Sequence, residues 1–306
     1  MSRKEFDELF EQVCNWGRWG AEDEKGTLNY LTPAMVRKSA SMVKSGRTVS
    51  MSRPIETSAA VDNATPMVHR MTRLYHRPKD GSEEPQFVSD YLGGEMHGDA
   101  YSHVDALCHV SYRGRLYNDR RVDVVTSQGA KSMDITQYRR GIVGRGVLLD
   151  IPRLRKVKWL EPGETVTAEE LEEAEEAEGV RLGKGDVLVF RVGHSLRRQE
   201  LGAWDIEVEG RAGLAPAAMR LLYERRISAF FPDADGETIP SPVEGVRYPV
   251  HVLQLTSMGL ACADSLQLED LSRACQEEKR WEFMVALSPL VIPGGTGSLT
   301  NPVAVL

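Results

Sequence analysis

The sequence has few cysteines and no long apolar run. Its four cysteines, at positions 14, 108, 262 and 275, include no Cys-x-x-Cys pair. This spacing argues against a disulfide framework and against a cysteine-rich zinc site. No uninterrupted apolar stretch approaches the roughly 18 residues that a membrane-spanning helix needs. The N-terminus also lacks the apolar core of a signal peptide. We therefore expect a cytoplasmic protein that has no membrane partner.

A concentrated positive charge is also missing. The 306 residues carry 38 Lys and Arg against 45 Asp and Glu, a net charge of −7. A nucleic-acid partner would require a basic surface, so we expect none. Hydrophobic residues make up 41% and charged residues 27%, which is typical of a globular protein with a substantial core. The expected partner is a small molecule.

Helix and strand patterns alternate along the chain. Phe6, Leu9 and Phe10 recur at helical spacing, and Thr32 followed by Pro33 opens a second helix. A capping box at residues 167–170 predicts a helix that ends near residue 179. Strands are predicted at 141–150, 186–192, 227–231, 282–287 and 303–306, a helix from 214 to 223, and a polar loop at 80–90. The alternation predicts one α/β domain over residues 46–306, with a helical extension over residues 1–45 packed on it.

Ligand-type side chains concentrate between residues 97 and 109. Three of the seven histidines, His97, His103 and His109, lie there together with Asp99 and Asp105. In an extended segment His103 and Asp105 project from the same face, because residues i and i+2 share a face of a strand. Imidazole and carboxylate groups bind zinc or manganese, and they also transfer protons near neutral pH. The cluster therefore predicts an enzyme.

This segment resembles the signature of the cyclase-like hydrolase family, which contains bacterial kynurenine formamidase and isatin hydrolase. That signature reads His-x-Gly-Thr-His-x-Asp-x-Pro-x-His, and this chain has His103-x-Asp105-x-x-x-His109. Residues 230–233 (Phe-Phe-Pro-Asp), 249–251 (Pro-Val-His), 264–268 and 289–298 resemble later segments of the family. The block from 16 to 29 is similar to that of the longer branch of the family. The resemblance spans most of the chain from about residue 90 onward. It implies a swivelling β/β/α fold and a homodimer or larger assembly.

The resemblance also implies a role for each residue. His103 and Asp105 would bind one or two ions of zinc or manganese, with help from His251 and Asp264. Water bound to such an ion is acidified toward a pKa of about 7 and can attack a carbonyl carbon. His109 would transfer the proton to the leaving group. The implied activity is hydrolysis of a cyclic amide, an N-formyl amide or a lactone.

The chain departs from the family signature at several positions. Asp99 stands where the formamidases place a histidine, and as a ligand it would favour harder ions. His97 is a candidate replacement, although it lies two residues out of register. Tyr101 replaces a glycine, so we expect its ring in or beside the pocket. Asp264 replaces a glutamate and shortens the reach of that ligand by one methylene group.

Three hypotheses for the function stay open. The leading one is the metal-dependent hydrolase, with Tyr101, His97 and Trp19 in contact with an aromatic or cyclic substrate. The second is a cyclase or dehydratase that tailors an aromatic or polyketide-like metabolite. It would run the same chemistry in reverse or work without a metal, with His109, Asp105 and Tyr101 as general acid and base groups. The third is a binding protein that has lost turnover, against which the intact ligand motif argues.

Overall fold

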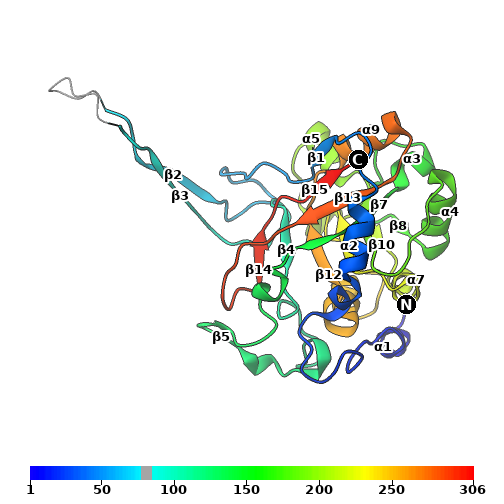
Figure 1. The fold of residues 1–306 in the computed structure, drawn as a ribbon. Coiled ribbons are helices and arrows are strands. Elements are labelled where there is room, and N and C mark those ends of the chain that lie inside the picture. The colour runs from blue at the N-terminus through cyan, green and yellow to red at the C-terminus, as the bar shows by residue number, and fades with distance from the viewer. Residues whose placement is uncertain (77–84) are drawn as a thin grey trace.

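A curled nine-stranded sheet organises the fold (Figure 1). The structure, a computed structural model, describes residues 1–76 and 85–306. The strands lie in the order β1-β15-β13-β7-β9-β11-β12-β4-β14. Their bounds are β1 Thr48–Ser50, β4 His103–Asp105, β7 Ile142–Asp150, β9 Val187–Arg191, β11 Ala229–Pro232, β12 Ala261–Asp264, β13 Glu282–Leu287, β14 Gly297–Leu299 and β15 Val303–Val305. Four of these strands, β7, β9, β11 and β12, run parallel, so their carboxyl ends meet at one edge of the sheet.

Both faces of the central strands are buried. Along β7, Leu148 belongs to one apolar cluster, whereas Val147 and Leu149 belong to a second cluster on the opposite face. This arrangement explains the nearly continuous apolar sequence of these strands. Phe6 and Leu9 of the first helix lie in the second cluster, so the N-terminal helix contributes to the core.

Helices surround the sheet, and most begin at capping residues visible in the sequence. They are α1 Arg3–Gln12, α2 Pro33–Ala40, α3 Ile151–Arg155, α4 Ala168–Glu178, α5 His194–Leu201, α6 Ile206–Glu209, α7 Met219–Arg225, α8 Pro249–His251 and α9 Glu269–Glu278. Thr32 caps α2, and Thr167 with Glu170 forms the predicted capping box of α4, which ends at Gly179. Within the described ranges, no helix is long and apolar enough to cross a membrane.

The predicted strands are confirmed, with ends shifted by a few residues. The helix predicted from residue 214 starts later, at Met219. Residues 213–214 form the short strand β10, which pairs with β8 (Thr165–Val166), and Pro216 begins a 3₁₀ turn before α7. Of the polar loop predicted at 80–90, residues 80–84 lie outside the described residues, and 89–90 belong to strand β3.

Three smaller elements lie outside the main sheet. The hairpin of β2 (Val68–Arg73) and β3 (Ser89–Gly93) projects away from the body (Figure 1). A short antiparallel pair is formed by β5 (Val125–Thr126) and β6 (Gly129–Ala130). A buried π-helix, Val252–Met258, directly follows α8. Such π-helical turns are uncommon and are often found at functional sites.

Candidate metal centre

The centre is built on one face of the paired strands β4 and β12. These strands are antiparallel, with Asp105 opposite Cys262 and His103 opposite Asp264. Because directly opposed residues and alternate residues share a face, these four side chains lie on the same side of the sheet. All four are buried. The neighbouring residue Val104 points into the apolar core on the other side.

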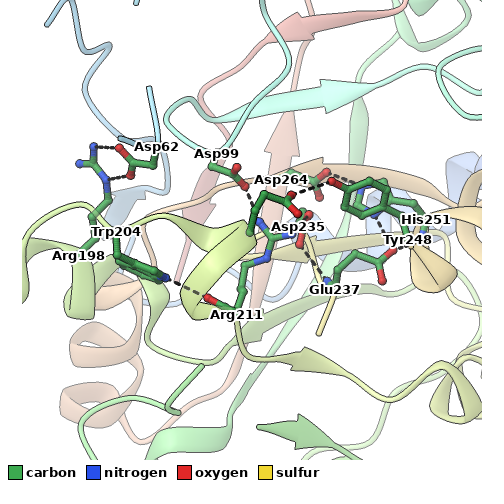
Figure 2. A network of polar contacts seen from close by, with 12 residues as sticks. Asp62, Asp99, Arg198, Trp204, Arg211, Asp235, Glu237, Tyr248, His251 and Asp264 are labelled. Atoms are coloured by element: carbon green, nitrogen blue, oxygen red, sulfur yellow. Dashed lines mark hydrogen bonds and ion pairs between the residues drawn. The ribbon is translucent and has the colours of Figure 1, made fainter. Parts of the chain in front are cut away.

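His251 reaches this face from α8 and is held by two carboxylates (Figure 2). Its Nε2 lies 3.1 Å from Asp264 Oδ2, and its Nδ1 lies 3.1 Å from Glu237 Oε1. Glu237 also accepts hydrogen bonds from the backbone N–H groups of Val250 at 3.1 Å and of His251 at 2.6 Å. Burial disfavours the charged imidazole, but the hydrogen bonds to both carboxylates outweigh it and raise the pKa of His251 well above its usual value.

Two further histidines surround Asp105. The rings of His97 and His109 are stacked, with centroids 3.8 Å apart and planes within 4°. His97 Nδ1 lies 2.8 Å from Asp105 Oδ1, and His109 Nε2 lies 3.9 Å from Asp105 Oδ2. Burial lowers the pKa of His109 to about 4, although the charge of Asp105 opposes this shift. Burial would raise the pKa of Asp105, but the imidazoles around it outweigh burial and hold that pKa below its usual value.

The residues present fit a divalent metal ion. Two groups have donor atoms within 4.8 Å of one another, one of Asp105, His251, Cys262 and Asp264, the other of His97, Asp105 and His109. Asp264 Oδ1 is buried and has no hydrogen-bond partner among the described residues. A buried carboxylate oxygen without a partner is costly, and a cation would satisfy it. Nitrogen, sulfur and carboxylate donors together are typical of zinc, and the nitrogen and carboxylate donors also suit manganese.

Asp99 lies in the cavity wall but belongs to neither donor group. Its side chain pairs with Arg211, which also pairs with Asp235 (Figure 2). Arg53 donates a hydrogen bond from Nη1 to the Asp99 carbonyl oxygen at 2.7 Å. Burial raises the pKa of Asp99, and the charge of Arg211 opposes that shift. The side chain of Asp99, which the sequence predicts as a metal ligand, is therefore paired with a buried arginine in the structure.

The remaining predicted residues divide between the centre and its surroundings. His103 is oriented by a 2.8 Å contact between its Nδ1 and the Tyr101 carbonyl oxygen, which leaves its Nε2 on the side of Asp105. The ring of Tyr101 points elsewhere, and its hydroxyl donates to Asn63 Oδ1 at 2.7 Å. Trp19 packs edge-on against Tyr30. Neither Tyr101 nor Trp19 lines the cavity at the centre.

A cavity of about 490 Å³ opens onto the centre. Its lining includes the donor residues His97, His103, Asp105, His109, His251 and Asp264. The rest of the lining is mixed. Tyr112, Tyr248, Ile206 and Val246 are aromatic or aliphatic, and the charged residues are Arg3, Arg211, Arg247, Asp99, Glu207 and Asp235. This size is within the range of sites for small organic ligands.

Sequence reasoning missed Glu237, Arg211 and Cys262. Cys262 stands two residues before Asp264, so strand alternation could have placed both on one face. Glu237 lies four residues after the Phe-Phe-Pro-Asp segment at 230–233, in a loop whose sequence has no periodic pattern. Arg211 gave no local signal, because its partners Asp99 and Asp235 are distant in the sequence.

The mixed sheet and its buried histidine–carboxylate centre are those of an α/β protein with a candidate metal site. Comparison with known proteins identifies the family. Residues 49–237 match the family described as "Putative cyclase", so the chain belongs to that family. It is similar to a crystal structure of a novel cyclase, at 29% identity and a TM-score of 0.85, covering 96% of this chain and 100% of that chain. The predicted family resemblance and cyclase-like fold are confirmed.

More distant structures share the fold. Isatin hydrolase A from Ralstonia solanacearum is 19% identical, with a TM-score of 0.57, and the alignment covers 84% of this chain and 91% of that chain. A predicted metal-dependent hydrolase from Bacillus stearothermophilus is 16% identical, with a TM-score of 0.53 and coverage of 84% and 97%. No curated protein matches this sequence.

Proposed function

We propose that this protein is a metal-dependent hydrolase that opens a cyclic amide, an N-formyl amide or a lactone in a small aromatic or cyclic compound. The observation that carries the proposal is the buried donor set around Asp105 and Asp264, next to the imidazole of His109. One ion of zinc or manganese in the group of Asp105, His251, Cys262 and Asp264 would leave His109 free for proton transfer, whereas a second ion would need the group that contains His109.

The metal, held by Asp105, His251 and Asp264, would activate water and polarise a carbonyl group. His109 is neutral at pH 7, because burial lowers its pKa to about 4, so one ring nitrogen is free to accept a proton from the attacking water. Stacking on His97 fixes the plane of this imidazole. The same ring then returns the proton to the leaving nitrogen or oxygen atom.

Glu237 keeps His251 in the orientation that this role requires. Its carboxylate contacts Nδ1 of His251 and leaves Nε2 facing Asp264. A carboxylate behind a metal-binding histidine fixes the ring and makes the coordinating nitrogen more basic. Arg211, by pairing with both Asp99 and Asp235, holds the opposite wall of the cavity in place.

The cavity favours an aromatic substrate. Tyr112 and Tyr248 lie in its wall with Ile206 and Val246, so a flat apolar ring would find aromatic and aliphatic contacts. Two isatin hydrolase structures support an aromatic substrate, since one is bound to the product analogue thioisatinate and the other to benzyl benzoate.

Hydrolysis assays on isatin, N-formyl aromatic amines and aryl lactones test this proposal. The protein is assayed as purified, after removal of metal by a chelator, and after reloading with zinc or manganese. We expect turnover that consumes water, is lost with the metal and returns on reloading. Equal turnover before and after metal removal would contradict the proposal. Release of water from the substrate would instead indicate the cyclase or dehydratase.

We also propose that the protein is a homo-oligomer in which the β2–β3 hairpin contacts a second copy. Both strands are solvent-exposed, and a two-stranded hairpin alone is marginally stable in water. Its exposed apolar side chains are Val68, Met71, Leu74, Tyr75, Phe87, Val88, Tyr91 and Leu92. Such a surface is typical of an interface, and a second copy offers the same surface in return.

Light scattering on the purified protein tests the assembly. We expect a molar mass of at least twice the 34.1 kDa of one chain. Substitution of Tyr91 and Leu92 by aspartate should lower it, whereas Leu201→Asp, at an exposed position on α5, should leave it unchanged. A monomeric wild-type protein would contradict this part of the proposal.

A further inference from the structure

Cys262 occupies a position inside the donor set. It lies on β12 directly opposite Asp105 and two residues before Asp264, and it is fully buried. Its Sγ stands 3.7 Å from Asp105 Oδ2 and 3.8 Å from Asp264 Oδ2. We propose that Cys262 binds the metal through its thiolate and makes the centre select zinc over manganese. This inference rests on the proposed function, since it requires the same metal centre.

The distances agree with a shared ion. With a Zn–S bond of about 2.3 Å and a Zn–O bond of about 2.0 Å at a tetrahedral angle, the sulfur and oxygen atoms stand about 3.5 Å apart. The observed separations exceed this value by only a few tenths of an ångström. Small side-chain rotations would therefore bring the three donors onto one ion.

Cys262 packs in the apolar cluster that contains Leu148, but its thiol does more than fill space there. A thiol is a weak hydrogen-bond donor, yet here it faces two buried carboxylates that need strong partners. Asp264 is only 2% exposed, and its Oδ1 has no hydrogen-bond partner in the described parts of the chain. A cation between Cys262, Asp105 and Asp264 satisfies all three side chains.

Binding through sulfur has a consequence for the choice of metal. The thiol loses its proton to solvent when the metal–sulfur bond forms, so the neutral thiol becomes an anionic ligand. Thiolate is a soft ligand that zinc accepts and manganese disfavours, whereas carboxylates suit manganese. Cys262 therefore opposes the preference for harder ions that the carboxylates alone would give.

Cobalt substitution tests the metal–sulfur bond directly. The full-length protein is stripped of metal, loaded with Co²⁺, and compared with Cys262→Ser and with Cys275→Ser, a substitution at another buried cysteine on α9. We expect a near-ultraviolet sulfur-to-cobalt charge-transfer band in the wild type and in Cys275→Ser, and none in Cys262→Ser. Zinc titrations should show a dissociation constant more than about 100-fold higher in Cys262→Ser, because even outer-shell changes cost 10–100-fold. The dissociation constant for manganese should change less.

Each result has one interpretation. A wild-type protein that binds cobalt without the charge-transfer band overturns the assignment of Cys262 but leaves the metal centre in place. A band that persists in Cys262→Ser overturns it as well. A wild-type protein that binds neither cobalt nor zinc overturns the proposed function itself. Because the wild-type spectrum alone decides the first point, the test does not depend on the folding of the variant.

Discussion

Replacement of Glu237 by glutamine tests how the chain positions His251. Glu237 is fully buried, and its carboxylate accepts hydrogen bonds from two backbone N–H groups and contacts Nδ1 of His251. Glutamine has nearly the same shape but offers only one oxygen atom. If that oxygen keeps both contacts with His251, the amide nitrogen faces the N–H group of Val250.

The size of the effect follows from these contacts. One charge-assisted hydrogen bond is lost, which costs about 1.5–3 kcal/mol, and a buried donor remains unsatisfied, which costs about 1–3 kcal/mol. We expect the free energy of unfolding to fall by roughly 3–5 kcal/mol. Because His251 also loses the carboxylate that orients it, zinc affinity should fall about 10–100-fold.

Urea denaturation and zinc titration of Glu237→Gln measure the two effects. Glu244→Gln is the matched control, since Glu244 is an exposed residue in the loop between Glu237 and α8. The control should change neither quantity. A Glu237→Gln protein as stable as the wild type, with unchanged zinc affinity, would refute the reasoning.

Three further predictions concern the proton donor, a buried carboxyl group and the cavity wall. His109→Ala should lower hydrolysis about 10²–10⁴-fold and retain its metal content; loss of metal in step with activity would instead make His109 a ligand. Burial raises the pKa of Glu178 to about 8, so the unfolded chain ionises first as the pH rises and stability falls between about pH 4.5 and 8. In thermal denaturation Glu178→Gln should therefore be roughly 2–4 kcal/mol more stable than the wild type at pH 8 and as stable as the wild type at pH 4. Equal stability of the two proteins at both pH values would contradict the raised pKa of Glu178. Arg211→Met removes the partner of Asp99 and Asp235 and should cost roughly 2–4 kcal/mol in urea denaturation, less than for a fully buried pair because Asp99 keeps some solvent contact. A loss below about 1 kcal/mol would show that the pairing is not structural.

Local signals in the sequence predicted the helices α1, α2, α4 and α7 and the strands β7, β9, β11, β13 and β15, but not α5, α9 or the strand β12 that carries part of the centre. The caps of α2 and α4 depend on hydrogen bonds that span three residues, so Thr32 and the box from Thr167 to Glu170 were visible without any tertiary information. The buried strands were equally visible, because both faces of β7 and β9 are apolar. Strand β4 was less so, since it is three residues long and its place is set by pairing with β12 and β14.

The centre could be predicted only in part, because its contacts cross the sequence. Alternation within β4 placed His103 and Asp105 together. Alternation does not extend to Tyr101, which precedes the strand, and its ring turns toward Asn63. Asp99 was predicted as a metal ligand because it stands where the family signature has a histidine. In the structure its side chain pairs with Arg211, more than a hundred residues away, and no local pattern shows that contact. The orienting role of Glu237 depends equally on contacts that no local pattern reveals.

Elemental analysis of the purified protein tests the central claim most directly. Expressed in medium supplemented with zinc and manganese, the protein should contain about one to two equivalents of metal per chain, bound at the centre around Asp105 and Asp264. A folded protein that contains neither metal after such expression would contradict the account.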